Sequence, residues 1–311
     1  MLWYESFDQR VTDYLPDLRV EKDEPLSRHC SFRIGGAARR MAFPVNGEQM
    51  VLLMSFAQEC GAEPLLIGNG TNMLFPDEGL DRLVINTTKM NGVEIPVYDG
   101  VAAEDEVFAM AGATLAGVAN FACKQGLAGL EFAHGIPGTV GGAVCMNAGA
   151  YGGEMKQVLL GASVLFPEEG VRFLSCEELD LGYRHSVLTD HPDAVVLYAV
   201  FRLQKGDSAA IRGRMDELMA KRKKSQPLEY PSAGSTFKRP EGYFAGALIE
   251  QAGLKGLTVG GAQVSEKHAG FIINKGGATG AEVRELIRQV QQRVRANAGV
   301  MLEPEVKIVR P

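Results

Sequence analysis

Hydrophobic residues recur three and four positions apart in three segments, and this spacing predicts helices that bury one face. The first helix follows Asn46-Gly-Glu-Gln49, which resembles a capping box, and Gly61 can end it. The second ends in the basic run Lys221-Arg-Lys-Lys224, whose charges complement the dipole of the helix C-terminus. The third begins at the capping box Thr279-Gly-Ala-Glu282, and its apolar stripe predicts packing without a ligand. The apolar positions are Met50, Leu53, Met54 and Ala57, then Ile211, Met215, Leu218 and Met219, then Val283, Leu286, Ile287, Val290 and Val294.

Alternation of apolar and polar residues near the C-terminus predicts a strand. Its apolar face is expected to hold Val300, Leu302, Val306 and Ile308, and its polar face Glu303, Glu305 and Lys307. The spacing does not distinguish Glu303 from Glu305 as a functional residue. A solvated strand face is the ordinary explanation of both.

Composition narrows the class of protein. The chain has 311 residues and 46% hydrophobic residues, enough for two or three domains. A net charge of −6 makes nucleic acid an unexpected partner. No apolar run has the length of a membrane span, and MLWYESFDQR lacks the features of a signal peptide, so a cytoplasmic protein is expected. The five scattered cysteines include no CxxC pair, which predicts no disulfide framework and no metal site.

A tight loop, Gly68-Asn-Gly-Thr-Asn72, follows the predicted short strand Pro64-Leu-Leu-Ile67. Its backbone N–H groups can approach a phosphate closely. A dinucleotide-binding turn does not fit, because Met73 replaces the third glycine, and Pro76 and Gly79 stand where a phosphate-capping helix should begin. Taken alone, the loop is better explained as a plain turn between two strands.

A second glycine-dense segment runs from His134 to Glu154 and contains seven glycines together with Ile136, Val140, Val144 and Met146. Bare backbone beside apolar side chains suits a large planar cofactor that carries a diphosphate. Close packing of strands or helices through small residues explains the segment equally well. Two such segments in one chain favour one extended ligand.

Seven motifs in one order resemble a known family. They are Ser31-Phe-Arg-Ile-Gly-Gly36, Gly68-Asn-Gly-Thr-Asn72, Gly129-Leu-Glu131, Gly135-Ile-Pro-Gly-Thr-Val-Gly-Gly-Ala143 through Met146-Asn-Ala-Gly-Ala-Tyr-Gly152, Tyr183-Arg-His-Ser186, Tyr230-Pro-Ser-Ala-Gly-Ser-Thr-Phe-Lys-Arg-Pro240 and Leu302-Glu-Pro-Glu-Val306. Together they cover roughly residues 20 to 310 and resemble the UDP-N-acetylenolpyruvoylglucosamine reductases.

The resemblance implies an α+β protein with an FAD-binding fold of the vanillyl-alcohol-oxidase type. Residues 1–204 are expected to bind FAD non-covalently in two subdomains, about 20–88 and 89–204. Residues 205–311 are expected to form an α+β substrate-binding domain, with the last strand returning towards the flavin site. The implied cofactor-binding residues are Arg33, Gly68, Asn69, Gly70, Thr71, Asn72, Gly135, Ile136, Gly138, Thr139, Gly141, Gly142, Asn147, Ala148 and Gly149.

The resemblance also implies a reaction. NADPH reduces the flavin, and the flavin N5 then delivers hydride to the vinyl carbon of UDP-N-acetyl-3-O-(1-carboxyvinyl)-glucosamine. A proton added to C2 completes UDP-N-acetylmuramate, a step of bacterial peptidoglycan synthesis. A monomer is expected, with no nucleic acid or membrane partner.

Three residues carry the implied chemistry. Ser235 is expected to donate the proton to C2, although a serine needs a hydrogen-bonded relay for this, and a turn serine bonded to its own backbone is the structural alternative. Arg184 is expected to bind the substrate carboxylate through two hydrogen bonds. Glu305 is expected to assist at the enolate, which would require a raised pKa. All three are expected to face the reactive nitrogen of the flavin.

Substrate binding is assigned by the resemblance to Tyr183, Lys238 and Arg239. One of the four basic residues 221–224 is expected to face the diphosphate as well. His134 and His29 are expected to be structural residues.

The chain from Tyr183-Arg-His-Ser186 to the basic helix has no room for an inserted tyrosine-bearing loop. It therefore resembles the shorter, second type of this reductase, in which other residues must supply the lid. A related FAD-dependent hydroxy-acid oxidase is the alternative enzyme, and a flavin-free UDP-sugar-binding module is the alternative without catalysis.

Overall fold

The computed structural model describes residues 2–311, which pack into two compact units. Unit 1 holds the N-terminal segment up to Glu21, Arg40–Asn69 and Arg82–Lys221. Unit 2 holds Lys22–Arg39, Gly70–Asp81 and the remainder from Arg222. The domain boundary predicted between residues 204 and 205 stays a prediction. It separates an FAD-binding part from a substrate-binding part, whereas the two units are defined by internal packing.

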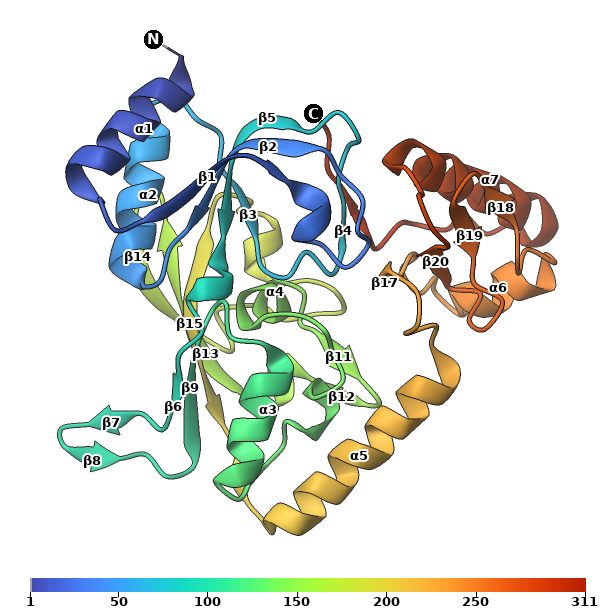
Figure 1. Cartoon of the computed structure of the whole chain (residues 1–311). Coiled ribbons are helices and arrows are strands. Elements are labelled where there is room, and N and C mark those ends of the chain that lie inside the picture. The colour runs from blue at the N-terminus through green and yellow to red at the C-terminus, as the bar shows by residue number, and fades with distance from the viewer. Residues whose placement is uncertain (1) are drawn as a thin grey trace. The chain divides into compact units, whose positions relative to one another are not determined.

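The three predicted helices are all present (Figure 1). The seven α-helices of the described residues are α1 (Trp3–Tyr14), α2 (Gly47–Glu59), α3 (Leu115–Lys124), α4 (Val140–Cys145), α5 (Ser208–Ser225), α6 (Ala245–Gln251) and α7 (Gly280–Ala298). Asn46 caps α2 by accepting from the Gln49 backbone N–H, and Thr279 with Glu282 forms the predicted capping box of α7. None of these helices is long and apolar enough to cross a lipid bilayer.

Two sheets build unit 1. The first has the order β1-β2-β5-β3, and the second has the order β14-β13-β15-β9-β6. The strands are β1 (Arg19–Pro25), β2 (Ala37–Phe43), β3 (Leu65–Ile67), β5 (Leu80–Asn86), β6 (Val93–Glu94), β9 (Glu106–Met110), β13 (Leu159–Phe166), β14 (Gly170–Ser175) and β15 (Val195–Arg202). Helices α3 and α4 share a core with the second sheet, and α1 and α2 share another with residues of both sheets. Strands β1, β2 and β5 carry the chain across the boundaries between the units.

Short two-stranded pairs complete unit 1. These are β7 (Val97–Tyr98) with β8 (Val101–Ala102), β10 (Leu127–Ala128) with β16 (Gln204–Lys205), and β11 (Gly149–Ala150) with β12 (Gly153–Glu154). The β11–β12 hairpin turns at Tyr151 and Gly152, both of which have positive φ. The predicted glycine-rich segment therefore spans α4 and this hairpin.

Unit 2 contains the antiparallel sheet β17-β20-β19-β18 with α6 and α7 packed beside it (Figure 1). Its strands are β17 (Ser232–Ser235), β18 (Thr258–Val259), β19 (Ala262–Val264) and β20 (Phe271–Asn274). A separate parallel pair joins β21 (Lys307–Ile308) to β4 (Met73–Leu74), directly after the predicted phosphate loop.

The predicted C-terminal strand over residues 300–308 is largely wrong. Only Lys307–Ile308 is a strand, preceded by one isolated bridge between Pro304 and Phe237. Pro304 has no N–H to donate, and this interrupts the ladder. The alternation of burial survives in part, since Leu302 and Val306 are buried and Glu303 is exposed.

Gly213 provides a stability prediction. It lies on the exposed side of α5, and a Cβ added there would meet no atom within 4 Å. Because alanine loses less backbone entropy in a helix, Gly213→Ala should raise the free energy of unfolding by about 0.5–1 kcal/mol. Denaturant unfolding of both proteins measures this, and a destabilised variant would contradict it.

Candidate active site

The two predicted glycine-rich segments come together in unit 1. A Cβ on Gly68 would lie 2.2 Å from Thr139 Oγ1, so only glycine fits beside this buried threonine. Asn69 Nδ2 also approaches the Pro137 carbonyl oxygen, at 3.5 Å. The sequence predicted both segments as parts of one ligand site, and the structure places them in contact.

Several main-chain N–H groups beside this contact have no protein partner. Among residues 2–311, the backbone N–H groups of Asn69, Gly138 and Thr139 make no hydrogen bond, whereas Val140 and Gly141 donate to the Ala113 and Ala111 carbonyls. Unpaired N–H groups next to a glycine form the kind of concavity that binds anions. The fold therefore fits the diphosphate of a dinucleotide at this point.

Other glycines of the same segment are required by packing. A Cβ on Gly141 would lie 3.2 Å from Ala111 Cβ, one on Gly149 would lie 2.7 Å from the Gly153 carbonyl oxygen, and one on Gly153 would lie 2.5 Å from the Phe132 ring. The alternative of close packing through small residues thus explains these three positions. Predicted cofactor contacts at Gly141, Gly149, Gly135, Ile136, Gly142 and Ala148 stay predictions.

The turn that carries Tyr183 and Arg184 also lies against the glycine-rich segment. Gly182 and His185 form an isolated antiparallel bridge, so the two residues sit at the tip, with Arg184 at φ 54°. Ser186 Oγ donates to the Cys145 carbonyl at 2.8 Å, and Asn147 Nδ2 donates to the Gly182 carbonyl at 3.0 Å. The guanidinium carbon of Arg184 lies 5.3 Å from the Tyr183 ring centroid.

Ser235 ends strand β17 in unit 2 and does not lie in a turn. The β17–β20 register shifts between Ser232 and Ser235, at Gly234 with φ 75°. The Ser31 hydroxyl donates to the Ser232 carbonyl at 2.6 Å, which joins two of the sequence motifs. Within residues 2–311 no hydrogen bond involves Ser235 Oγ. The serine is therefore not bonded to its own backbone, and no protein group forms a relay behind it.

Glu305 lies beside this strand. Its backbone N–H donates to the Thr236 carbonyl at 2.8 Å, and its carbonyl accepts from Asn72 Nδ2 at 3.0 Å. The structure therefore brings Asn72, Ser235 and Glu305 into one part of unit 2. Arg184 belongs to unit 1, so the predicted grouping of all three catalytic residues stays a prediction.

Lys238, Arg239 and Arg33, three basic residues predicted for ligand binding, lie in unit 2. Lys238 forms an ion pair with Glu303. The Arg239 guanidinium stacks 4.0 Å from the Phe244 ring centroid. Arg33 is exposed at φ 56°, and Gly70 and Thr71 continue the phosphate loop beside Asn72. Ligand binding by these residues stays a prediction.

His134 has an unusual environment for a structural residue. Its Nδ1 is buried and has no hydrogen-bond partner among residues 2–311. Burial lowers the pKa of the imidazole, and the positive charge of Arg212 lowers it further, against the opposing charge of Asp216. Both effects favour the neutral imidazole.

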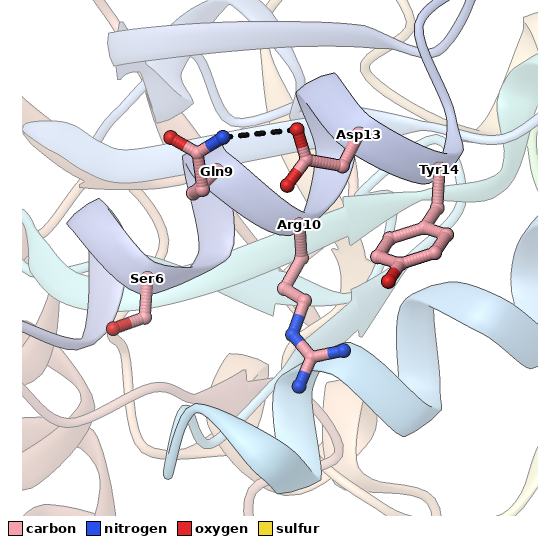
Figure 2. Close-up of a pocket in the computed structure, with 5 residues that line it drawn as sticks. All are labelled: Ser6, Gln9, Arg10, Asp13 and Tyr14. Atoms are coloured by element: carbon pink, nitrogen blue, oxygen red, sulfur yellow. Dashed lines mark hydrogen bonds between the residues drawn. The ribbon is translucent and has the colours of Figure 1, made fainter.

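One surface pocket lies away from these motifs. It has a volume of about 400 Å³ and is lined by side chains of α1, namely Ser6, Gln9, Arg10, Asp13 and Tyr14 (Figure 2). Gln9 donates a hydrogen bond to Asp13 one turn further along α1, and Arg10 forms an ion pair with Glu59. It contains none of the predicted site residues.

Comparisons with known proteins agree with this geometry. Residues 38–174 match an FAD binding domain, and residues 226–309 match the C-terminal domain of UDP-N-acetylenolpyruvoylglucosamine reductase. The reductase of Agathobacter rectalis is 50% identical over 98% of each chain, and that of Pediococcus pentosaceus is 47% identical over 97% of this chain and 98% of the relative. The crystal structure of the Thermus caldophilus reductase is 35% identical, with a TM-score of 0.78, covering 94% of this chain and 100% of that one.

The chain is therefore an FAD-containing oxidoreductase of the predicted α+β fold. It belongs to the UDP-N-acetylenolpyruvoylglucosamine reductase family.

Proposed function

We propose that this protein reduces the enolpyruvyl ether of UDP-N-acetylglucosamine to UDP-N-acetylmuramate with NADPH, as a cytoplasmic step of bacterial peptidoglycan synthesis. The main structural support is the contact between Gly68 and Thr139, which joins two glycine-rich segments around unpaired backbone donors. The sequence identity of 50% to the Agathobacter rectalis reductase, along nearly the whole chain, supports the assignment of this substrate.

FAD, when bound, supplies the hydride chemistry that side chains cannot perform. The chain's own part is to hold that cofactor and to manage charge on the substrate. Asn69, Gly138 and Thr139 would hold the diphosphate through backbone N–H groups. The sequence also assigns cofactor contacts to Gly70, Thr71, Asn72 and Arg33, which belong to unit 2.

Hydride addition to the vinyl carbon leaves negative charge on the carboxylate side of the substrate. We assign its stabilisation to Arg184, whose planar guanidinium matches a carboxylate through two hydrogen bonds. Such a donor at a developing charge contributes about 2.7–4 kcal/mol. Tyr183, which is 58% exposed at the tip of the same turn, would line the substrate site.

The proton for C2 is assigned to Ser235, and Glu305 assists at the enolate. Because no protein relay contacts Ser235 Oγ among residues 2–311, the hydroxyl is left to bond a ligand or water. Lys238 and Arg239 would contact the UDP portion, with Lys238 exchanging its Glu303 partner for phosphate.

A spectroscopic assay tests the proposal. The purified protein should be yellow, and NADPH oxidation should depend on added enolpyruvyl UDP-sugar. A related hydroxy-acid oxidase would instead form peroxide from a hydroxy acid with little NADPH turnover, and a colourless protein that takes up no FAD would be a binding module. Either of these results would overturn the proposal.

A further inference from the structure

Asn147 occupies a junction between two site motifs of unit 1. It follows α4 in the glycine-rich segment, is 2% exposed and has φ 42°. Its Nδ2 donates to the Gly182 carbonyl at 3.0 Å and to Glu154 Oε2 at 3.1 Å, while its Oδ1 accepts from the Lys156 backbone N–H at 3.0 Å. One side chain thus ties the β11–β12 hairpin to the turn that carries Arg184.

These bonds use both protons of the Asn147 amide. The side chain therefore has no donor left for a cofactor, although the sequence predicted it as a cofactor-binding residue. Its bond to Gly182 fixes the first residue of the four-residue turn, and Ser186 Oγ fixes the other end through the Cys145 carbonyl. The two anchor points, Asn147 and Cys145, lie in the glycine-rich segment, which also contacts Gly68 through Thr139.

We infer that Asn147 is a positioning residue that holds the Tyr183–Arg184 turn in register with the flavin-binding segment. The inference rests on the proposed role of Arg184 at the substrate carboxylate. An asparagine suits the position for two reasons. It tolerates positive φ, and its amide donates to a carbonyl and a carboxylate at once, which an aspartate cannot do.

The test is a double-mutant cycle with Asn147→Gly and Arg184→Ala. Glycine accepts the backbone conformation and removes the bonds of the Asn147 side chain to Gly182, Glu154 and Lys156. Because small misplacement of a catalytic group can cost about 100-fold, Asn147→Gly should lower kcat/KM for the enolpyruvyl substrate by about 10- to 100-fold. Flavin content and the rate of flavin reduction by NADPH should stay within about twofold of wild type, since the tether touches neither.

Coupling distinguishes positioning from a general loss of structure. Arg184→Ala should lower kcat/KM by about 100- to 1000-fold in the wild-type protein. In the Asn147→Gly background the same change should cost about 10-fold less, because the guanidinium is already misplaced. Gln157→Ala is the matched control: Gln157 bonds Gly152 and Glu154 in the same hairpin but does not contact the turn, so it should leave kcat/KM unchanged.

Several outcomes would overturn the inference. If the losses of kcat/KM in Asn147→Gly and Arg184→Ala multiply in the double mutant, Asn147 is a structural residue only. If Asn147→Gly loses bound FAD, Asn147 is a cofactor ligand. If Arg184→Ala alone has no effect, the proposed role of Arg184 fails first. Should Asn147→Gly not fold, Asn147→Asp keeps the backbone conformation and the Lys156 bond, and the same cycle applies.

Discussion

Replacing Ser235 with alanine is expected to slow turnover of the enolpyruvyl substrate by about 10²- to 10⁴-fold, the range of a general acid. Flavin reduction by NADPH should be unchanged, because it needs no proton at the substrate C2. Stopped-flow absorbance at the flavin band separates the two half-reactions. Ser235 is half-buried at the end of β17, and within residues 2–311 its Oγ bonds no protein group, so the hydroxyl is left to bond a ligand or water.

Ser232→Ala provides the matched control on the same strand. Ser232 uses its backbone carbonyl, not its side chain, to accept from Ser31, so removing its hydroxyl should leave both half-reactions intact. An equal loss of both half-reactions in Ser235→Ala would contradict the proton-donor role and indicate a structural one.

The second large effect is expected at Gly68. In Gly68→Ala the new methyl group would lie 2.2 Å from Thr139 Oγ1 and 3.2 Å from Thr139 Cβ, inside a buried contact. Separating the two segments to relieve this overlap should cost about 1–3 kcal/mol. It should also displace the Asn69 and Thr139 backbone donors, so FAD affinity should fall at least about tenfold. Flavin absorbance per protein and fluorescence titration with FAD measure both effects.

A second substitution gives a rescue test. Gly68→Ala combined with Thr139→Ala removes the oxygen that lies at 2.2 Å and leaves Cβ at 3.2 Å, so flavin binding should partly return. Gly213→Ala is the control for adding a methyl group in open space. Full flavin content in Gly68→Ala alone would show that this contact does not shape the cofactor site.

Local signals in the sequence were sufficient for the three helices that it predicted, α2, α5 and α7. Asn46 and Thr279 cap α2 and α7 as predicted because a cap depends on residues within one turn. The buried positions of α5 and α7 likewise follow from apolar spacing alone. These features need no knowledge of distant parts of the chain.

Features that depend on distant partners could not be predicted in the same way. The segment around Glu305 alternates like a strand, yet its neighbours are Thr236 and Asn72, and Pro304 interrupts the ladder between them. Asn147 carried no local signal for a tether to Gly182, since 35 residues separate them. A positive φ at a buried asparagine is visible only in coordinates.

The glycine-rich segment shows why composition alone left two explanations open. Both apply, but to different residues. Gly153 is required by the Phe132 ring, whereas the Gly138 N–H is one of the backbone donors that stay unpaired. Assigning each glycine to packing or to ligand binding needs the neighbours of each Cβ position.

The pairing of β21 with β4 has a consequence for biosynthesis. Asn72 and Glu305 are joined although 233 residues separate them, and β21 follows immediately. A ribosome must therefore continue far beyond Met73 and Leu74, as far as β21, before these two residues acquire their parallel neighbour. Until then this edge stays open on the nascent chain, where a chaperone can bind it or another strand can pair with it wrongly.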